Sequence, residues 1–450
     1  MLFFALFYAL IFWVVAFKRP FYALILVWAL APIQTDLGFG VAKFSLTELH
    51  LLLLMPLLLL RMRESRGAAS LGPLAWPIGT FLLISLLSTI VHWRGNAAVV
   101  SMMQMVLYIV LTVQIFSTLL KPDELRRIPQ SLVLTGAIWS VVGILTHFNF
   151  IGHLKNAFGS TLSVAFLVAF DLWLAEPKGA RRNWFLVGGS VIFMGLILSL
   201  SRGGWLGAIG GIVVIVMLRR ASHVMMRACI VAAPLLFICW NLLPQTQQDY
   251  AFSFDASRYN IKARFRSLHE AQDAFANDPI LGVGVGLRKQ YDATNLLWTT
   301  LAETGVIGAV SFAWIFVAFY RVTWRTRAKL DMKDPCFSLL TIGAALMTCK
   351  LLHGMVDHYW SRGAITLAWG GAGMVLVASR LPAQRAVESA RILAEQRRLA
   401  RRQGKSPVAV GHRGNNGNGA PRPIPIHAYA PIDSPVLVAS PRMESAWQDI

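Results

Sequence analysis

Residues 2–17 read LFFALFYALIFWVVAF, a run in which every side chain is apolar or aromatic. A second charge-free run extends from Phe81 to Val91, and similar runs recur over the first 380 residues. Runs of this kind cross a hydrocarbon layer about 30 Å thick as helices. In lipid the backbone must satisfy its own hydrogen bonds, and the alternation typical of barrel strands is absent. The sequence therefore predicts an all-α, polytopic integral membrane helical bundle.

The composition supports this prediction, because 56% of the residues are hydrophobic and only 14% are charged. The net charge of +20 does not indicate a nucleic-acid partner, since much of the basic charge lies in short loops and another share in the tail after Arg380. The four cysteines all fall in apolar segments and show no spacing typical of metal ligands or a disulfide framework.

About 12–13 transmembrane helices are expected from the apolar segments. Their approximate limits are 2–17, 21–33, 46–60, 74–91, 98–119, 131–148, 159–175, 184–200, 204–218, 228–243, 294–320, 336–352 and 363–379. Alternate loops are basic, so the positive-inside rule places these loops and the C-terminus in the cytoplasm. The first segment lacks the basic region and cleavage site of a signal peptide, and we expect it to be a retained helix.

One long external loop is expected at about residues 244–293 under this topology. Its later part, SRYNIKARFRSLHEAQDAFANDP, is predicted to be helical and contains Arg258, Arg264 and Arg266. Basic residues on this side run against the positive-inside trend, and this favours a functional role for them. The alternative is that each is a charge facing solvent or lipid headgroups.

The C-terminal region divides into two parts. Residues 381–403 have the pattern of an amphipathic basic helix that rests on anionic membrane lipids. Residues 404–450 are rich in Pro, Gly and Asn and are expected to form a disordered cytoplasmic tail. We interpret both parts as a topology anchor without chemistry of its own.

The segment SLSRGGWLG, residues 199–207, places Arg202 at an external boundary of the membrane. Ionisable residues there are energetically costly and often functional, and the planar guanidinium suits phosphate oxygens. A snorkelling arginine is the structural alternative. A third external segment, HGMVDHYWSRG at residues 353–363, contains Asp357, His358 and Arg362. Its His–Asp pair suits general-base work, although a polar turn between helices would have the same composition.

The glycines of DPILGVGVG, residues 278–286, suggest a nucleotide loop at first sight. Their spacing is not that of a dinucleotide fingerprint, no strand precedes them, and the expected side is external. We therefore reject a nucleotide site. The three external segments together favour a phosphate-bearing, membrane-embedded substrate.

The run DPILGVGVG followed by TNLLWTTLAETGVIG, residues 294–308, resembles the O-antigen ligase/polymerase superfamily of bacterial envelope glycosyltransferases. SRGGWLG, and VDHYWSRG followed by WGGAGM, resemble further segments of that family. The resemblance covers roughly residues 150–380, which lie in an expected ligase- or polymerase-like domain of residues 1–380.

This resemblance implies transfer or polymerisation of a glycan from an undecaprenyl-pyrophosphate donor at the periplasmic face of the bacterial inner membrane. The acceptor would be a glycan, a lipid or a protein, and no metal, nucleotide sugar or other cofactor is implied. By motif matching, Arg202 and one or more of Arg258, Arg264 and Arg266 would bind the leaving pyrophosphate. Thr294, Asn295, Glu303 and Arg362 occupy motif positions.

The chain departs from the family at Thr294, where ligases carry a histidine that is a candidate base. Three possibilities stay open: Asp292 deprotonates the acceptor, the Asp357 and His358 pair does so, or catalysis depends mainly on stabilising the leaving pyrophosphate. A transporter or flippase of lipid-linked saccharides is the alternative function, and a polymerase rather than a ligase, or an inactive scaffold, are further alternatives. A transporter would more often show two similar halves and charges at mid-membrane, neither of which is evident here.

Overall fold

The protein is described here from a computed structural model. The described residues are 2–31, 37–39, 42–64, 71–149, 155–223, 259–287, 295–357 and 362–402, with the single positions 233, 237, 241, 245 and 248. The chain divides into two compact units, Met1–Glu388 and Ser389–Ile450. The described part of the second unit is helical.

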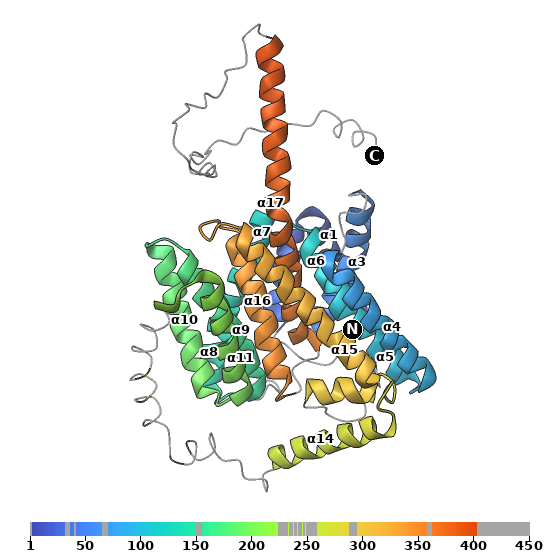
Figure 1. Ribbon diagram of the computed structural model, residues 1–450. Helices are drawn as coiled ribbons and strands as arrows, with labels where there is room; N and C mark the ends of the chain where they lie inside the picture. The colour runs from blue at the N-terminus through green and yellow to red at the C-terminus, as the bar shows by residue number, and fades with distance from the viewer. Residues whose placement is uncertain are drawn as a thin grey trace, which may run out of the picture. The chain divides into compact units, whose positions relative to one another are not determined.

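The described elements are almost all helices (Figure 1). The N-terminal half contains α1 (Leu2–Lys18), α2 (Pro20–Leu30), β1 (Leu37–Phe39), β2 (Ala42–Phe44), α3 (Leu46–Glu64), the 3-10 turn η1 (Gly72–Leu74), α4 (Ala75–Val91), α5 (Asn96–Val106), the π-helical turn η2 (Leu107–Leu111), α6 (Thr112–Thr118), α7 (Pro122–Leu125), α8 (Ile128–Leu145), α9 (Lys155–Ala175) and α10 (Ala180–Leu198). The remainder contains α11 (Arg202–Arg219), α14 (Tyr259–Asn277), α15 (Leu296–Lys329), α16 (Phe337–Gly354) and α17 (Arg362–Arg402). The two short strands pair antiparallel, with Leu37 opposite Phe44.

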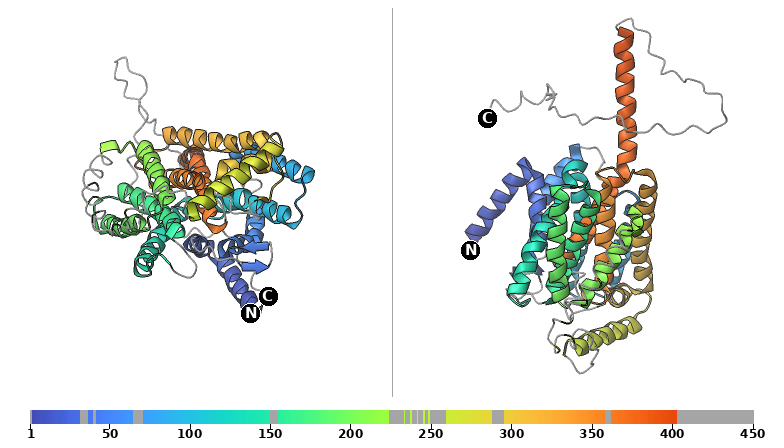
Figure 2. Two further views of the ribbon diagram at one scale, coloured as in Figure 1. Left: turned by 90° about the horizontal axis from the view of Figure 1, so that it is seen from below. Right: turned by 90° about the vertical axis from the view of Figure 1, so that its left-hand side faces the viewer.

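The predicted all-α, polytopic membrane fold is confirmed. Among the described residues, 8 helical stretches are long and apolar enough to cross a membrane, and two shorter apolar helices lie at the N-terminus. Every predicted segment except 228–243 coincides with a helix. That segment falls almost entirely outside the described residues. The helix predicted in the long loop is present as α14, which lies across one end of the bundle (Figures 1 and 2).

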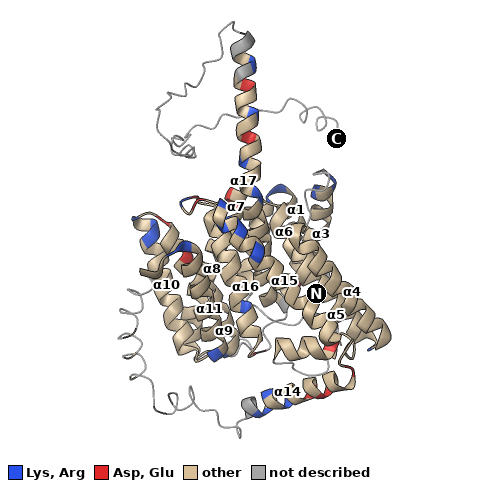
Figure 3. Cartoon of the chain, viewed as in Figure 1, with Lys and Arg blue, Asp and Glu red and all other residues tan. Residues whose placement is uncertain are grey.

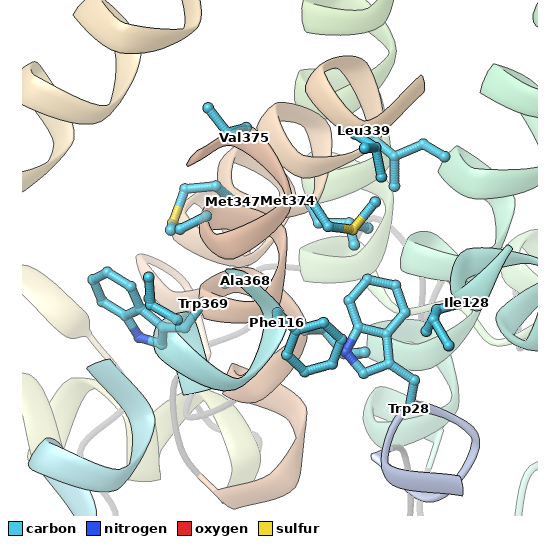
Figure 4. Close-up of a cluster of buried hydrophobic side chains, with 14 of the residues drawn as sticks. Trp28, Phe116, Ile128, Leu339, Met347, Ala368, Trp369, Met374 and Val375 are labelled. Atoms are coloured by element: carbon cyan, nitrogen blue, oxygen red, sulfur yellow. The ribbon is translucent and has the colours of Figure 1, made fainter. Parts of the chain in front are cut away.

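The core of the bundle is made of large apolar side chains from helices far apart in the sequence. Trp28 and Phe116 pack with ring centroids 5.0 Å apart, and Trp369 is fully buried nearby in the same cluster (Figure 4). Small residues bring other helices into contact, as where a Cβ added at Gly204 would lie 2.7 Å from the carbonyl oxygen of Gly159. Such contacts between small residues are typical of helix packing in membranes.

Two polar clusters are buried at helix ends. Ser45 and Glu48 form a capping box at the start of α3, and Gln104 Nε2 donates to the Glu48 carboxylate at 2.9 Å. Arg219 turns into the bundle from the last turn of α11 and forms a two-pronged ion pair with buried Asp171 of α9, at 2.6 and 2.8 Å. Arg219 directly follows the predicted span 204–218, and its side chain joins α9 to α11.

Helix α15 is broken at Gly305, whose φ of 65° is not helical. The sequence predicted one continuous span over 294–320, but the structure has a short first limb beside α14 and a long second limb (Figure 1). Helix α17 continues through the predicted basic segment as far as Arg402, with Pro382 inside it. The predicted tail, residues 404–450, and the proposed division at residue 380 stay predictions, because the tail lies outside the described residues.

Candidate functional site

Arg264 on α14 forms an ion pair with Asp357, which follows the last turn of α16. The guanidinium Nη2 donates to Asp357 Oδ2 at 2.6 Å. The carboxyl side chain is only 4% exposed, whereas the Arg264 side chain is 34% exposed. The pair therefore brings together a predicted pyrophosphate ligand and a predicted acid/base residue that are 93 positions apart.

Helix α9 supplies two further polar groups to the same region. Asn156 Nδ2 donates to Asp357 Oδ2 at 3.2 Å, and Ser160, one turn later, accepts a hydrogen bond from Lys350 Nζ at 2.8 Å. Lys350 is fully buried. Lys350, His353 and Asp357 are spaced i, i+3 and i+7, which places them on one face of α16 and its last turn. The Lys350 ammonium interacts electrostatically with Asp357 from the same face of the helix.

Arg202 opens α11, next to the end of α16. Ser201 caps this helix, since its side chain accepts from the backbone N–H of Gly204. A Cβ added at Gly203 would lie 2.6 Å from His353 Cδ2 and 3.2 Å from Val356 Cγ2. Arg202 therefore sits one residue from a tight contact with the turn that carries Asp357. The start of a helix is also electrostatically favourable for an anion.

Asn295, from the short polar motif, connects α15 to the same turn. Its Oδ1 accepts from the backbone N–H of Trp298 at 3.0 Å and caps the first limb of α15. Its Nδ2 donates to the carbonyl oxygen of Met355 at 2.8 Å. The structure thus gives Asn295 a positioning contact two residues before Asp357.

Glu303 has a different environment from the Arg264–Asp357 pair. Its side chain is buried, and its carboxylate accepts the backbone N–H of Gly286 at 3.2 Å. The Ser88 hydroxyl donates to the Glu303 carbonyl oxygen at 2.7 Å. These contacts tie the broken helix α15 to the glycine-rich segment and to α4, which is a structural role.

The glycine-rich segment packs its backbone directly against the break in α15. Val283 N–H donates to the Ala302 carbonyl at 2.8 Å, and Val306 N–H donates to the Pro279 carbonyl at 2.9 Å. At Gly282 (φ 75°), a Cβ would lie 2.5 Å from the backbone of Glu303. The glycines are thus required for contact between two backbone segments. This finding supports the rejection of a nucleotide loop.

Among the remaining predicted site residues, Arg266 is described and is not part of this cluster. Arg266 is 80% exposed and pairs with Glu270 on its own helix at 2.9 Å. Arg258, Asp292, Thr294 and His358 lie outside the described residues. Arg362 is the first residue of α17, but its side chain is not described.

Sequence reasoning missed two members of the cluster, Asn156 and Lys350. Lys350 lies inside a predicted span, and an ionisable residue in such a position is itself a signal of function. Asn156 carries no comparable signal in the sequence. Among the residues that the structure describes, no group of three or more His, Cys, Asp or Glu side chains is placed to hold a metal ion.

The comparisons with known proteins bear on this region. A family model described as O-antigen ligase matches residues 187–313. No curated protein matches the chain. The matched segment runs from α10 into the second limb of α15 and includes Arg202, Arg264 and Asn295. The resemblance drawn from the sequence motifs is thereby confirmed, because residues 187–313 match the O-antigen ligase family.

Proposed function

We propose that the chain transfers a glycan from a polyprenyl-pyrophosphate-linked donor to an acceptor hydroxyl at the periplasmic face of the bacterial inner membrane. The family match supports glycan transfer and lipid-linked glycan substrates in general. The undecaprenyl-pyrophosphate donor, the choice of face and the glycan, lipid or protein acceptor are our proposal.

The observation that carries the proposal is the Arg264–Asp357 pair and the cations around it. Arg264 of α14 contacts Asp357, Lys350 lies on the same face of α16, and Arg202 of α11 precedes Gly203, which packs against the turn before Asp357. Arginine suits phosphate because its planar guanidinium forms paired, charge-assisted hydrogen bonds. When the glycosidic bond to the donor breaks, negative charge accumulates on the pyrophosphate, and fixed cations in a site shielded from water stabilise that charge.

The distribution of charge supports an external site. Figure 3 shows Lys and Arg gathered at the upper ends of the bundle helices and again along α14 at the opposite end. Under the positive-inside rule, the upper end faces the cytoplasm and α14 faces the periplasm. The Arg264–Asp357 pair then lies at the periplasmic face, where a lipid-linked donor would present its pyrophosphate.

The group that removes the acceptor's proton stays open. Asp292 and His358 remain candidates, and both lie outside the described residues. Asp357 is already engaged by Arg264 and Asn156. This engagement favours the third possibility, in which stabilising the leaving pyrophosphate supplies most of the catalysis.

The proposal is tested in cells that depend on this chain for a surface polysaccharide. Arg202→Ala and Arg264→Ala should each abolish or strongly reduce the ligated or polymerised glycan on a gel. Arg266→Ala is the matched control, because Arg266 is on the same helix as Arg264 but is largely exposed. Normal glycan in both arginine variants, at wild-type protein levels, would refute the proposal.

A flippase is the competing function, and its prediction differs in the fate of the donor. A flippase moves the intact lipid-linked saccharide across the bilayer, whereas a transferase cleaves it. The Arg264–Asp357 pair joins the turn after α16 to α14, which lies across one end of the bundle (Figure 1), and a charged site at one end favours transfer.

A further inference from the structure

The Asp357 carboxylate occupies the position of an anion beside Arg264. It accepts from Arg264 at 2.6 Å and from Asn156 at 3.2 Å, both through Oδ2. A phosphate oxygen seeks the same kind of donor as a carboxylate oxygen. A pyrophosphate that binds Arg264 must therefore compete with a carboxylate that is already in place.

The competition is feasible because the two partners differ in burial. Arg264 is 34% exposed and comes from α14, so its guanidinium is accessible from the surface. Asp357 is 4% exposed and cannot follow it into solvent. Losing the ion pair would leave a buried carboxylate, which is costly unless other groups compensate its charge.

Lys350 supplies that compensation. It is fully buried, is held by Ser160 at 2.8 Å, and interacts electrostatically with Asp357 from one face of α16. Asn156 stays within hydrogen-bond distance of the same carboxylate. The carboxylate thus has a hydrogen-bond donor on α9 and an electrostatic interaction with α16, and neither depends on α14.

We propose that Asp357 is an anion placeholder. It holds Arg264 at the donor's phosphate site, yields the guanidinium to the incoming pyrophosphate, and is then held by Lys350 and Asn156. Asp357 is in this sense a positioning residue and not the base. This inference rests on the proposed function, because it takes the donor's pyrophosphate as the competing anion.

The test is binding of farnesyl pyrophosphate, as a short soluble donor analogue, to the purified full-length chain by titration calorimetry. Asp357→Asn keeps the shape and removes the competing charge, so the dissociation constant should fall by roughly five- to tenfold. Asp334→Asn is the control. Asp334 lies in the loop before α16 and also forms an ion pair with an arginine, Arg385 of α17.

Lys350→Met should have the opposite effect on the affinity for farnesyl pyrophosphate. Without the ammonium, Asp357 stays on Arg264, and the analogue should bind several-fold more weakly. In the Asp357→Asn background, Lys350→Met should change the affinity little, since no carboxylate needs compensation. Equal weakening in both backgrounds would instead show that Lys350 contacts the phosphate directly.

The outcomes separate this inference from the proposed function. If the wild-type chain binds farnesyl pyrophosphate and Asp357→Asn binds it equally or more weakly, the placeholder is refuted and the pyrophosphate site stands. If neither protein binds the analogue, while both elute as folded monodisperse species, the pyrophosphate site itself is refuted. Tighter binding by Asp357→Asn alone among the aspartate variants supports both.

Discussion

Replacing Arg264 with alanine should slow glycan transfer by about 10²–10³-fold, because losing one donor to the developing charge costs about 2.7–4 kcal/mol in comparable sites. The Arg264 guanidinium contacts the Asp357 carboxylate at 2.6 Å. The other arginine of α14, Arg266, pairs only with Glu270 of its own helix among the contacts described. Arg264→Lys should fall between the wild type and alanine, because lysine keeps the charge but loses the planar fork.

The same substitution should also lower the free energy of unfolding. It removes a partner of the buried Asp357 carboxylate, which keeps Asn156 at 3.2 Å. Leaving a buried acceptor partly unsatisfied costs about 1–3 kcal/mol. The partial exposure of Arg264, 34%, places the expected loss toward the lower end of that range.

The assay is the initial rate at which the purified chain releases polyprenyl pyrophosphate from a lipid-linked oligosaccharide, with thermal unfolding measured on the same samples. Arg266→Ala is the control: that side chain is 80% exposed, and its pair with Glu270 is worth about 0.3–0.5 kcal/mol. Equal rates for the two alanine variants would refute the reasoning, because one arginine is in the cluster and the other is not.

Three further predictions concern the framework. Gly305→Ala should destabilise the fold by about 1–3 kcal/mol in thermal unfolding, because its φ is 65° and a Cβ would lie 2.0 Å from the backbone oxygen of Ile280. Gly79→Ala is the control and should be neutral or stabilising, because a Cβ there meets open space on α4. Asp171→Ala should cost about 3–5 kcal/mol in denaturant unfolding by leaving Arg219 buried without its carboxylate, and an unchanged midpoint would contradict this. Burial raises the pKa of the Cys336 thiol to about 11. A variant that keeps Cys336 as its single cysteine should therefore resist maleimide at pH 7 and react faster as the pH rises toward the pKa. Rapid labelling of the folded protein at neutral pH would contradict this prediction.

The elements that the sequence predicted well are those set by local chemistry. Charge-free runs such as residues 2–17 specify helices because lipid leaves the backbone no other partner. The segment around Arg264 was likewise predicted to be helical and forms α14. The sequence could not show the break at Gly305, since that break depends on backbone contacts from Pro279 and Ile280, which belong to a different segment.

The site was predictable only in part. Arg264 and Asp357 were both selected, but their pairing joins residues 93 positions apart and leaves no local pattern. Lys350 did leave a signal, an ionisable side chain inside an apolar span, and that signal was overlooked. The family motif also made Glu303 a site candidate, and its buried contact with the backbone of Gly286, 17 positions away, left no local pattern.

The central claim is tested most directly by incubating the purified full-length chain with a polyprenyl-pyrophosphate-linked oligosaccharide and an acceptor glycan, lipid or peptide, in the presence of a metal chelator and without nucleotides. Mass spectrometry then follows the lipid and the acceptor. The account predicts free polyprenyl pyrophosphate together with glycosylated acceptor, and about 10²–10³-fold slower formation of both products by the Arg264→Ala variant. Intact donor that only changes its side in reconstituted vesicles would contradict the account and identify a transporter.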